Sequence, residues 1–192
     1  MSETELVERL TGIVRATPAL MQVLRTVRAL TLPDWMVFSG AVYQPVLNHL
    51  TGRAPDYGVK DYDLGYFDAS DLSYEAEDAV IRRVAAAFDE PLRSKVEVRN
   101  QARVHLWFED HFGEAYSPLS STAGVLERFA SPMFAVGVRL DAKDRLHFAA
   151  PFGLADLFTL RLRPNPRRPN SGFERAAARA LNRWSEILVE RQ

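Results

Sequence analysis

The sequence predicts a mixed α/β domain, an α+β arrangement in which helices pack on one sheet and further helices flank it at both ends of the chain. Three observations support this class. Apolar runs typical of strands alternate with amphipathic stretches through the middle of the chain, residues 2–30 show helical periodicity, and so does the end of the chain. We therefore expect a single domain over 1–192, with a core at about 35–166 and helical extensions at 1–32 and 171–190.

The first 30 residues predict two helices. Ser2 and Glu5 have the spacing of a capping box, and Thr17 followed by Pro18 is typical of a second helix start. Apolar residues recur at helical spacing behind both starts, so each helix is expected to bury one face.

A short apolar run at 35–38 predicts a buried strand, and Ser39-Gly40-Ala41 follows it directly. The apolar stretch after this turn predicts a helix. A strand that enters a helix through small residues leaves backbone N–H groups free at the helix start, and that arrangement favours phosphate.

The run VKDYDLGYF at 59–67 predicts a strand that carries two aspartates. Because successive side chains of a strand alternate, Asp61 and Asp63 would share one face with Gly65. Two carboxylates ~7 Å apart on one strand are suited to hold divalent cations, which prefer oxygen ligands.

Ser73 is expected to cap a helix that has acids in its first turn. A strand at 95–99 would then place Glu97 on a polar face, and alternation over 103–108 predicts a second strand or a bent continuation. On that continuation, Asn100 and Arg103 would lie near Glu97. We interpret both as nucleotide-binding candidates.

The C-terminal half continues the alternation. It predicts a helix at 122–130, strands at 133–140 and 145–149, and a helix at 154–162. The basic, proline-rich connector RPNPRRPNSG leads to a last helix with a capping box at Ser171 and Glu174. An apolar stripe from Phe173 to Leu188 on this helix would serve as core packing or as the face of a homodimer.

Composition excludes several classes of function. The chain has 192 residues, 47% hydrophobic and 26% charged, as is typical of a globular protein with a full core. A net charge of −1 gives no electrostatic case for long nucleic acid. The absence of cysteine excludes disulfides, thiolate catalysis and cysteine zinc sites. The N-terminus is not typical of a signal peptide and no run reaches the ~20 apolar residues of a membrane span, so we expect a cytoplasmic protein with no membrane partner.

The chemistry-bearing residues allow two interpretations. In one, Asp61, Asp63 and Glu97 hold metal ions, Mg²⁺ or Mn²⁺, beside a phosphate bound near Gly40, because three neighbouring carboxylates repel one another unless a cation lies between them. In the other, the acids are solvated, the glycine turn is structural, and Glu97 pairs with a neighbouring lysine or arginine.

A family resemblance bears on this choice. A glycine after a strand, then Asp-x-Asp about twenty residues later, then an acid on a later strand resembles the polymerase-beta-type nucleotidyltransferase superfamily. The chain from Trp35 to Pro166 more closely resembles a bacterial nucleotidyltransferase-like family. The stretches that carry this resemblance are SGAVYQPVLNHLTG, KDYDLGYFD, VEVRNQARVHLW, APFGLADLF and RPNP.

The resemblance implies a nucleotidyltransferase-like core that moves a nucleoside monophosphate (NMP) from a nucleoside triphosphate (NTP) to an unknown hydroxyl acceptor. Asp61 and Asp63 match the metal-binding pair, Glu97 matches the third carboxylate, which assists the metal and activates the acceptor hydroxyl, and Ser39-Gly40 matches the phosphate-binding turn. The superfamily has two glycines followed by Ser or Thr, whereas this chain has Ser39-Gly40-Ala41. This departure keeps two alternatives open: a non-catalytic nucleotide-binding protein, and a protein-interaction module that uses its C-terminal helix.

Overall fold

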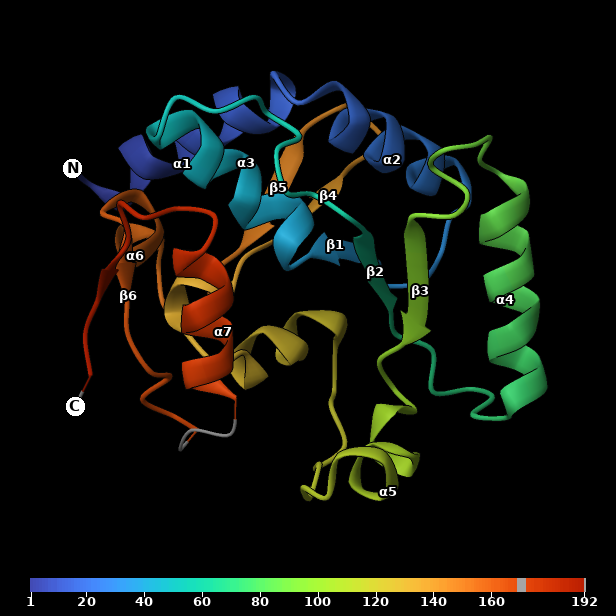
Figure 1. The fold of residues 1–192 in the computed structure, drawn as a ribbon. Helices are drawn as coiled ribbons and strands as arrows, with labels where there is room; N and C mark the ends of the chain where they lie inside the picture. Colours follow the sequence, from blue (N-terminus) through green and yellow to red (C-terminus); the bar gives the residue numbers. More distant parts are fainter. Residues whose placement is uncertain (169–171, 192) are drawn as a thin grey trace.

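The computed structural model describes residues 1–168 and 172–191, and a five-stranded mixed sheet forms its centre (Figure 1). The strands lie in the order β3-β2-β1-β4-β5. Their bounds are Met36–Phe38 for β1, Tyr62–Tyr66 for β2, Val96–Asn100 for β3, Gly137–Leu140 for β4 and Leu146–Ala149 for β5.

The direction of each strand follows from its connection. Strand β2 runs parallel to β3 because helix α4 (Tyr74–Ala86) carries the chain back between them, whereas β4 and β5 form an antiparallel hairpin. The central strand β1 is antiparallel to both neighbours, and its last residue, Phe38, lies opposite Asp63 of β2. The start of the helix after β1 is thereby brought close to the acidic strand.

Three helices cover one side of the sheet: α1 (Glu3–Arg15), α2 (Pro18–Ala29) and α3 (Gly40–Leu50) (Figure 1). Their apolar sides and the sheet form the main core, in which several side chains are completely buried. Among these are Val14, Leu24, Val37, Val42 and Val138. Full burial of one such aliphatic side chain contributes about 1.5–3 kcal/mol. No helix in the described part of the chain is long and apolar enough to cross a membrane.

The predicted helix starts are largely confirmed. Ser2 and Glu5 form a reciprocal capping box, and the Ser73 hydroxyl accepts a hydrogen bond from the Ala76 N–H. Pro18 opens α2, although the Thr17 hydroxyl donates to the Ile13 carbonyl instead of capping that helix. Ser171 lies outside the described residues, and α7 (Phe173–Leu181) begins after Gly172.

The strand predicted over 103–108 is wrong. A 3₁₀ turn at Val104–Leu106 and the short helix α5 (Phe108–Phe112) occupy this segment. The Gln101 N–H makes the last bond to β2, at 2.7 Å to the Tyr66 carbonyl, and the Arg103 N–H then turns back to the Asn100 carbonyl. The alternating apolar residues do not share one buried face: Val104 is buried, Leu106 is exposed, and Phe108 packs on other aromatic rings. We find the Trp107, Phe108 and Tyr116 rings clustered there.

Three boundaries also differ from the prediction. The helix expected over 154–162 is the short α6 (Ala155–Phe158), because Leu160 has φ of 55° and breaks the helix before β6 (Arg161–Leu162). The strand expected over 133–140 starts at Gly137, after a 3₁₀ turn at Pro132–Phe134. A 3₁₀ helix at Thr122–Arg128 occupies the segment expected to be helical at 122–130.

The last helix is shorter than expected, because the chain turns after Leu181 and lets Trp184 enter the core, where its indole N–H donates to Asn48 at 2.9 Å. Leu188 then belongs to β7 (Leu188–Val189), which pairs with β6. Phe173, Ala177 and Trp184 are buried, so this part of the predicted stripe is core packing.

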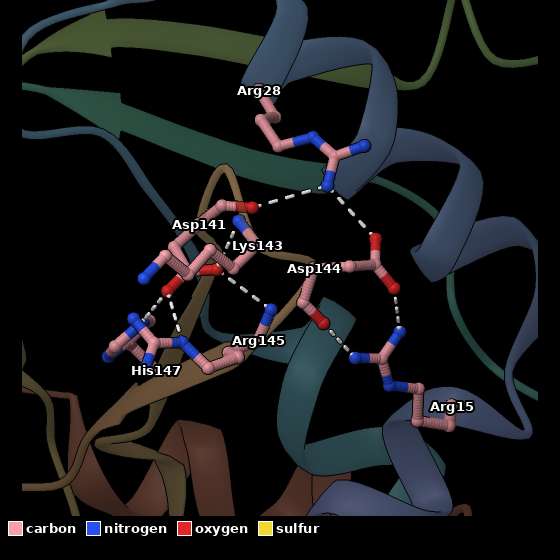
Figure 2. Close-up of polar contacts among 7 residues, drawn as sticks. All are labelled: Arg15, Arg28, Asp141, Lys143, Asp144, Arg145 and His147. Carbon is pink, nitrogen blue, oxygen red and sulfur yellow. Dashed lines mark hydrogen bonds and ion pairs between the residues drawn. The ribbon is translucent and has the colours of Figure 1, made fainter.

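The turn between β4 and β5 ties the sheet to the N-terminal helices (Figure 2). The Asp144 carboxylate accepts from Arg15 of α1 at 2.7 Å and from Arg28 of α2 at 2.9 Å. Asp141 closes the turn by accepting from the Arg145 side chain at 2.8 Å. Arg15 and Arg28 hold the pKa of Asp144 below its usual value.

Replacing Asp144 by asparagine is expected to lower the melting temperature by a few degrees at neutral pH and low salt. Asparagine tolerates the same backbone conformation, φ of 60°, but cannot pair with both arginines. Because the folded-state pKa of Asp144 is depressed, its contribution is present above the unfolded value of 3.8 and is lost as the pH falls through the folded-state pKa. Melting curves at several pH and salt values measure this. A difference from the native protein that persists in strong acid would contradict the ion-pair role, and Lys143→Gln is the matched control.

Candidate functional site

The turn between β1 and α3 has the geometry of an anion-binding helix start. The helical ladder begins with the N–H groups of Val42 and Tyr43, which donate to the Ser39 carbonyl at 3.0 and 3.1 Å. The N–H groups of Gly40 and Ala41 precede this ladder, at the positive end of the helix dipole. Gly40 lies close to the Gln44 side chain: an added Cβ would lie 2.6 Å from the Gln44 amide nitrogen, so that flexible side chain would have to move.

Ser39 makes this turn possible with a backbone that serine rarely adopts, φ of 64° and ψ of −141°. Such a conformation costs a non-glycine residue about 1–3 kcal/mol and is found mostly at functional sites. The Ser39 side chain makes no capping bond to the helix and interacts with the Asp63 carboxylate instead.

Ser39→Gly is expected to raise the free energy of unfolding by about 1 kcal/mol, because glycine adopts the positive φ without strain. Ser39→Ala keeps the strain, so its stability should stay close to that of the native protein. Urea denaturation of the two variants tests this. A Ser39→Gly variant less stable than Ser39→Ala would show that the backbone at this position is not strained.

The two aspartates of the Asp-x-Asp pair lie at the start of β2. Asp61 is exposed just before the strand, and Asp63 is half-buried within it. In register, Asp63 lies opposite Phe38 of β1 on one side and Glu97 of β3 on the other. The fold therefore brings the end of β1, the acidic pair and Glu97 together, as the sequence-based hypothesis requires.

The charge on Asp63 is unfavourable in this setting. Burial, followed by repulsion from Asp61, raises its pKa to about 6, and Glu97 adds to the rise. A hydrogen bond from Ser39 and the positive charge of Arg99 act in the opposite direction. A group of like charges with incomplete compensation suits a bound cation.

The donor chemistry of these acids fits a hard divalent cation, because carboxylate oxygens are the ligands that Mg²⁺ and Mn²⁺ prefer. Across the described residues, no three Asp, Glu or His side chains converge in an arrangement able to hold a metal. Asp61 and Asp63 are two positions apart at the start of β2, and Glu97 lies on the neighbouring strand β3.

Two hollows meet at the acidic strand. The first, which we call the basic cleft, has a volume of about 630 Å³, and its lining includes Ser39, Gly40, Lys60, Asp61, Arg179 and Arg183. The second, which we call the aromatic pocket, has a volume of about 300 Å³, and its lining includes Asp63, Glu97, Gln101, Trp107, Phe108 and Tyr116. The aspartate pair thus has one member in each hollow.

The basic side chains of the cleft were not identified from the sequence. Arg179 and Arg183 lie on and just after α7, which Figure 1 shows beside the sheet, far along the chain from the aspartates. Together with Arg175 they repeat every four residues along α7 and the turn that follows it. That periodicity is the signal that would have pointed to them.

Asn100 and Arg103 hold the structure together around β3. The Asn100 amide is bonded to both the N–H and the carbonyl of Asp68, at 3.1 and 2.8 Å. Arg103 forms an ion pair with Glu77 of α4. Neither side chain lines the basic cleft or the aromatic pocket.

Comparison with known proteins identifies the class. A solved protein whose NMR structure is described as revealing a CCA-adding enzyme head domain superposes with a TM-score of 0.74 at 21% sequence identity, and the match covers 96% of each chain. At that identity the likeness concerns the fold, and it confirms the nucleotidyltransferase-like core expected from the sequence.

The family follows from the sequence match. The family described as "Nucleotidyltransferase" matches residues 25–189, so this chain belongs to that nucleotidyltransferase family. None of the curated proteins compared with the chain matches it significantly.

Proposed function

We propose that this protein transfers an NMP group from an NTP to a hydroxyl of a second substrate. The observation that carries the proposal is the position of the Asp61/Asp63 pair, between a basic cleft that begins at a free helix start and a second hollow that contains Glu97. Family membership supports the same reaction class.

In this proposal the basic cleft binds the nucleotide. The N–H groups of Gly40 and Ala41 hold the triphosphate, and Lys60, Arg179 and Arg183 neutralise its charge. These side chains supply the anion binding that the missing hydroxyl after Gly40 would otherwise provide.

Asp61 and Asp63 would hold Mg²⁺ or Mn²⁺, with Glu97 in support. Nucleotidyltransferases generally use divalent metal ions, which would neutralise the negative charge on the phosphate oxygens of the transferred group and of the leaving group. The acceptor oxygen bonds to the α-phosphorus, the bond from that phosphorus to the bridging oxygen breaks, and pyrophosphate leaves. Glu97 takes the proton of the acceptor hydroxyl.

A thermal-shift panel tests the nucleotide and metal assignments together. The four NTPs are tested with Mg²⁺, with Mn²⁺ and with EDTA, on the native protein and on the Asp61→Asn/Asp63→Asn variant. A ligand that binds only the folded state stabilises it by about 2.7 kcal/mol at a hundred times its dissociation constant. We expect a metal-dependent shift that disappears in the double variant. No shift with any nucleotide would refute the proposal.

Binding without turnover is the second candidate, and Ala41 favours it because the first turn of α3 then lacks the hydroxyl of the superfamily's turn. Pyrophosphate release in the presence of candidate acceptors distinguishes it from catalysis. An interaction module built on the C-terminal helix is less well supported, because Phe173, Ala177 and Trp184 are buried in the core.

A further inference from the structure

The aromatic pocket has the features of a small-molecule site. Its volume of about 300 Å³ lies at the lower end for pockets that hold small ligands, roughly 300–1,000 Å³. Phe108 packs on Tyr116 with ring centroids 4.5 Å apart, and Trp107 lies 6.1 Å from Phe108. The Arg128 guanidinium stacks on the outer part of this cluster, 4.8 Å from the centre of the Tyr116 ring. Aromatic walls of this kind bind flat rings.

Two polar atoms in the pocket wall lack protein partners. Gln101 is 4% exposed and Tyr116 is 9% exposed, and both side chains line the pocket. The Gln101 Oε1 and the Tyr116 hydroxyl are buried, and neither has a hydrogen-bond partner within the described part of the chain. Leaving such a buried group unpaired is unfavourable. A ligand with its own hydrogen-bonding groups would satisfy both.

The wall that carries Gln101 is closely packed. Gly65 of β2 lies beneath it, and an added Cβ there would come within 2.7 Å of the Phe38 ring and 3.1 Å of the Gln101 side chain. The Gln101 N–H is bonded to the Tyr66 carbonyl at 2.7 Å. The sheet therefore holds the Gln101 backbone, and the side-chain amide nitrogen donates to the Arg99 carbonyl at 3.5 Å, which leaves Oε1 without a partner among the described residues.

We propose that the aromatic pocket binds the acceptor, and that the acceptor is a small planar ring compound of nucleoside size that carries an alcohol. Its ring would lie against Trp107, Phe108 and Tyr116, and a ring N–H or O–H would donate to Gln101. Its hydroxyl would then face Glu97 and Asp63, the acids that line the same pocket. The role of the bound compound as acceptor rests on the proposed function, whereas the existence of the binding site does not depend on it.

Direct binding tests the inference. Isothermal titration is performed with the four ribonucleosides, 4-hydroxybenzyl alcohol and tryptophol, and ribose and inositol serve as non-aromatic controls. We expect at least one ring alcohol to bind, and neither control to do so. Gln101→Leu should weaken this binding at least tenfold, and Tyr116→Phe, which removes only the hydroxyl, should weaken it less. Melting curves of both variants verify that they fold.

The matched control is Arg179→Ala in the basic cleft. It should weaken binding of an α,β-methylene NTP with Mg²⁺ and leave binding of the ring alcohol unchanged within twofold, whereas Gln101→Leu should have the reverse pattern. Ring-alcohol binding without any NTP binding would refute the transfer reaction but would still support the aromatic pocket as a binding site. No binding by any ring compound, equal binding by Gln101→Leu, or competition between the NTP analogue and the ring alcohol would overturn the inference.

Discussion

Replacing Asp63 by asparagine is expected to lower the rate of NMP transfer by at least about 100-fold, the scale of losing one group that stabilises charge in the transition state. Asp63 is the member of the pair that faces the aromatic pocket, beside Glu97, and it shares the proposed metal with Asp61. Asparagine has nearly the same shape but is a weaker cation ligand. The measurement is pyrophosphate release with an NTP, Mg²⁺ and an acceptor.

Stability separates a functional role of Asp63 from a structural one. The variant removes a carboxylate that lies near two other acids, so its melting temperature should be no lower than that of the native protein. Asp89→Asn, at a fully exposed aspartate far from the sheet centre, is the control and should retain full activity. An Asp63→Asn variant with native activity, or one that loses activity only because it unfolds, would refute the metal assignment.

The sequence predicted the acidic strand and its surroundings well because local patterns determine them. Alternation around Asp61 and Asp63, a glycine after an apolar run, and serine caps each depend on a few neighbouring residues. The parallel pairing that places Glu97 opposite Asp63 was consistent with the pattern of strand, helix and strand.

The two hollows could not be predicted in the same way. Arg179 reaches the basic cleft from a helix more than a hundred residues after Gly40, and long-range contacts such as the hydrogen bond from Trp184 to Asn48 hold that helix end. The segment after Asn100 has strand-like alternation, yet β3 is an edge strand and the chain leaves the sheet there. Tertiary packing, which the local pattern does not contain, decided both cases.

The ion pair between Glu77 and Arg103 supports the largest stability prediction. Glu77 lies in the first turn of α4 with a side chain 6% exposed, and that of Arg103 is 12% exposed. The Glu77 Oε1 also accepts from the Asn100 N–H at 2.8 Å, and the Arg103 Nε donates to the Leu72 carbonyl at 3.2 Å. The pair therefore joins α4 to the end of β3.

Arg103→Leu is expected to lower the free energy of unfolding by about 3–5 kcal/mol, because it leaves the Glu77 carboxylate buried without its partner. The double variant Glu77→Gln/Arg103→Leu should be more stable than Arg103→Leu alone, since glutamine is uncharged and still accepts from the Asn100 N–H. Urea denaturation with unchanged m-values measures both differences. Arg82→Leu is the control on the same helix, where an exposed pair with Asp78 should contribute no more than about 1 kcal/mol.

The same variants decide between two roles for Arg103. A nucleotide-binding Arg103, as the sequence suggested, predicts that Arg103→Leu and the double variant lose NTP affinity equally, because both lack the guanidinium. A structural Arg103 predicts that folded protein of either variant binds an NTP analogue as Arg82→Leu does, and that only stability changes. Titration of the analogue below the melting temperature of each variant separates the two. We expect the structural outcome, because the guanidinium is engaged with Glu77 and Leu72 and does not line the basic cleft.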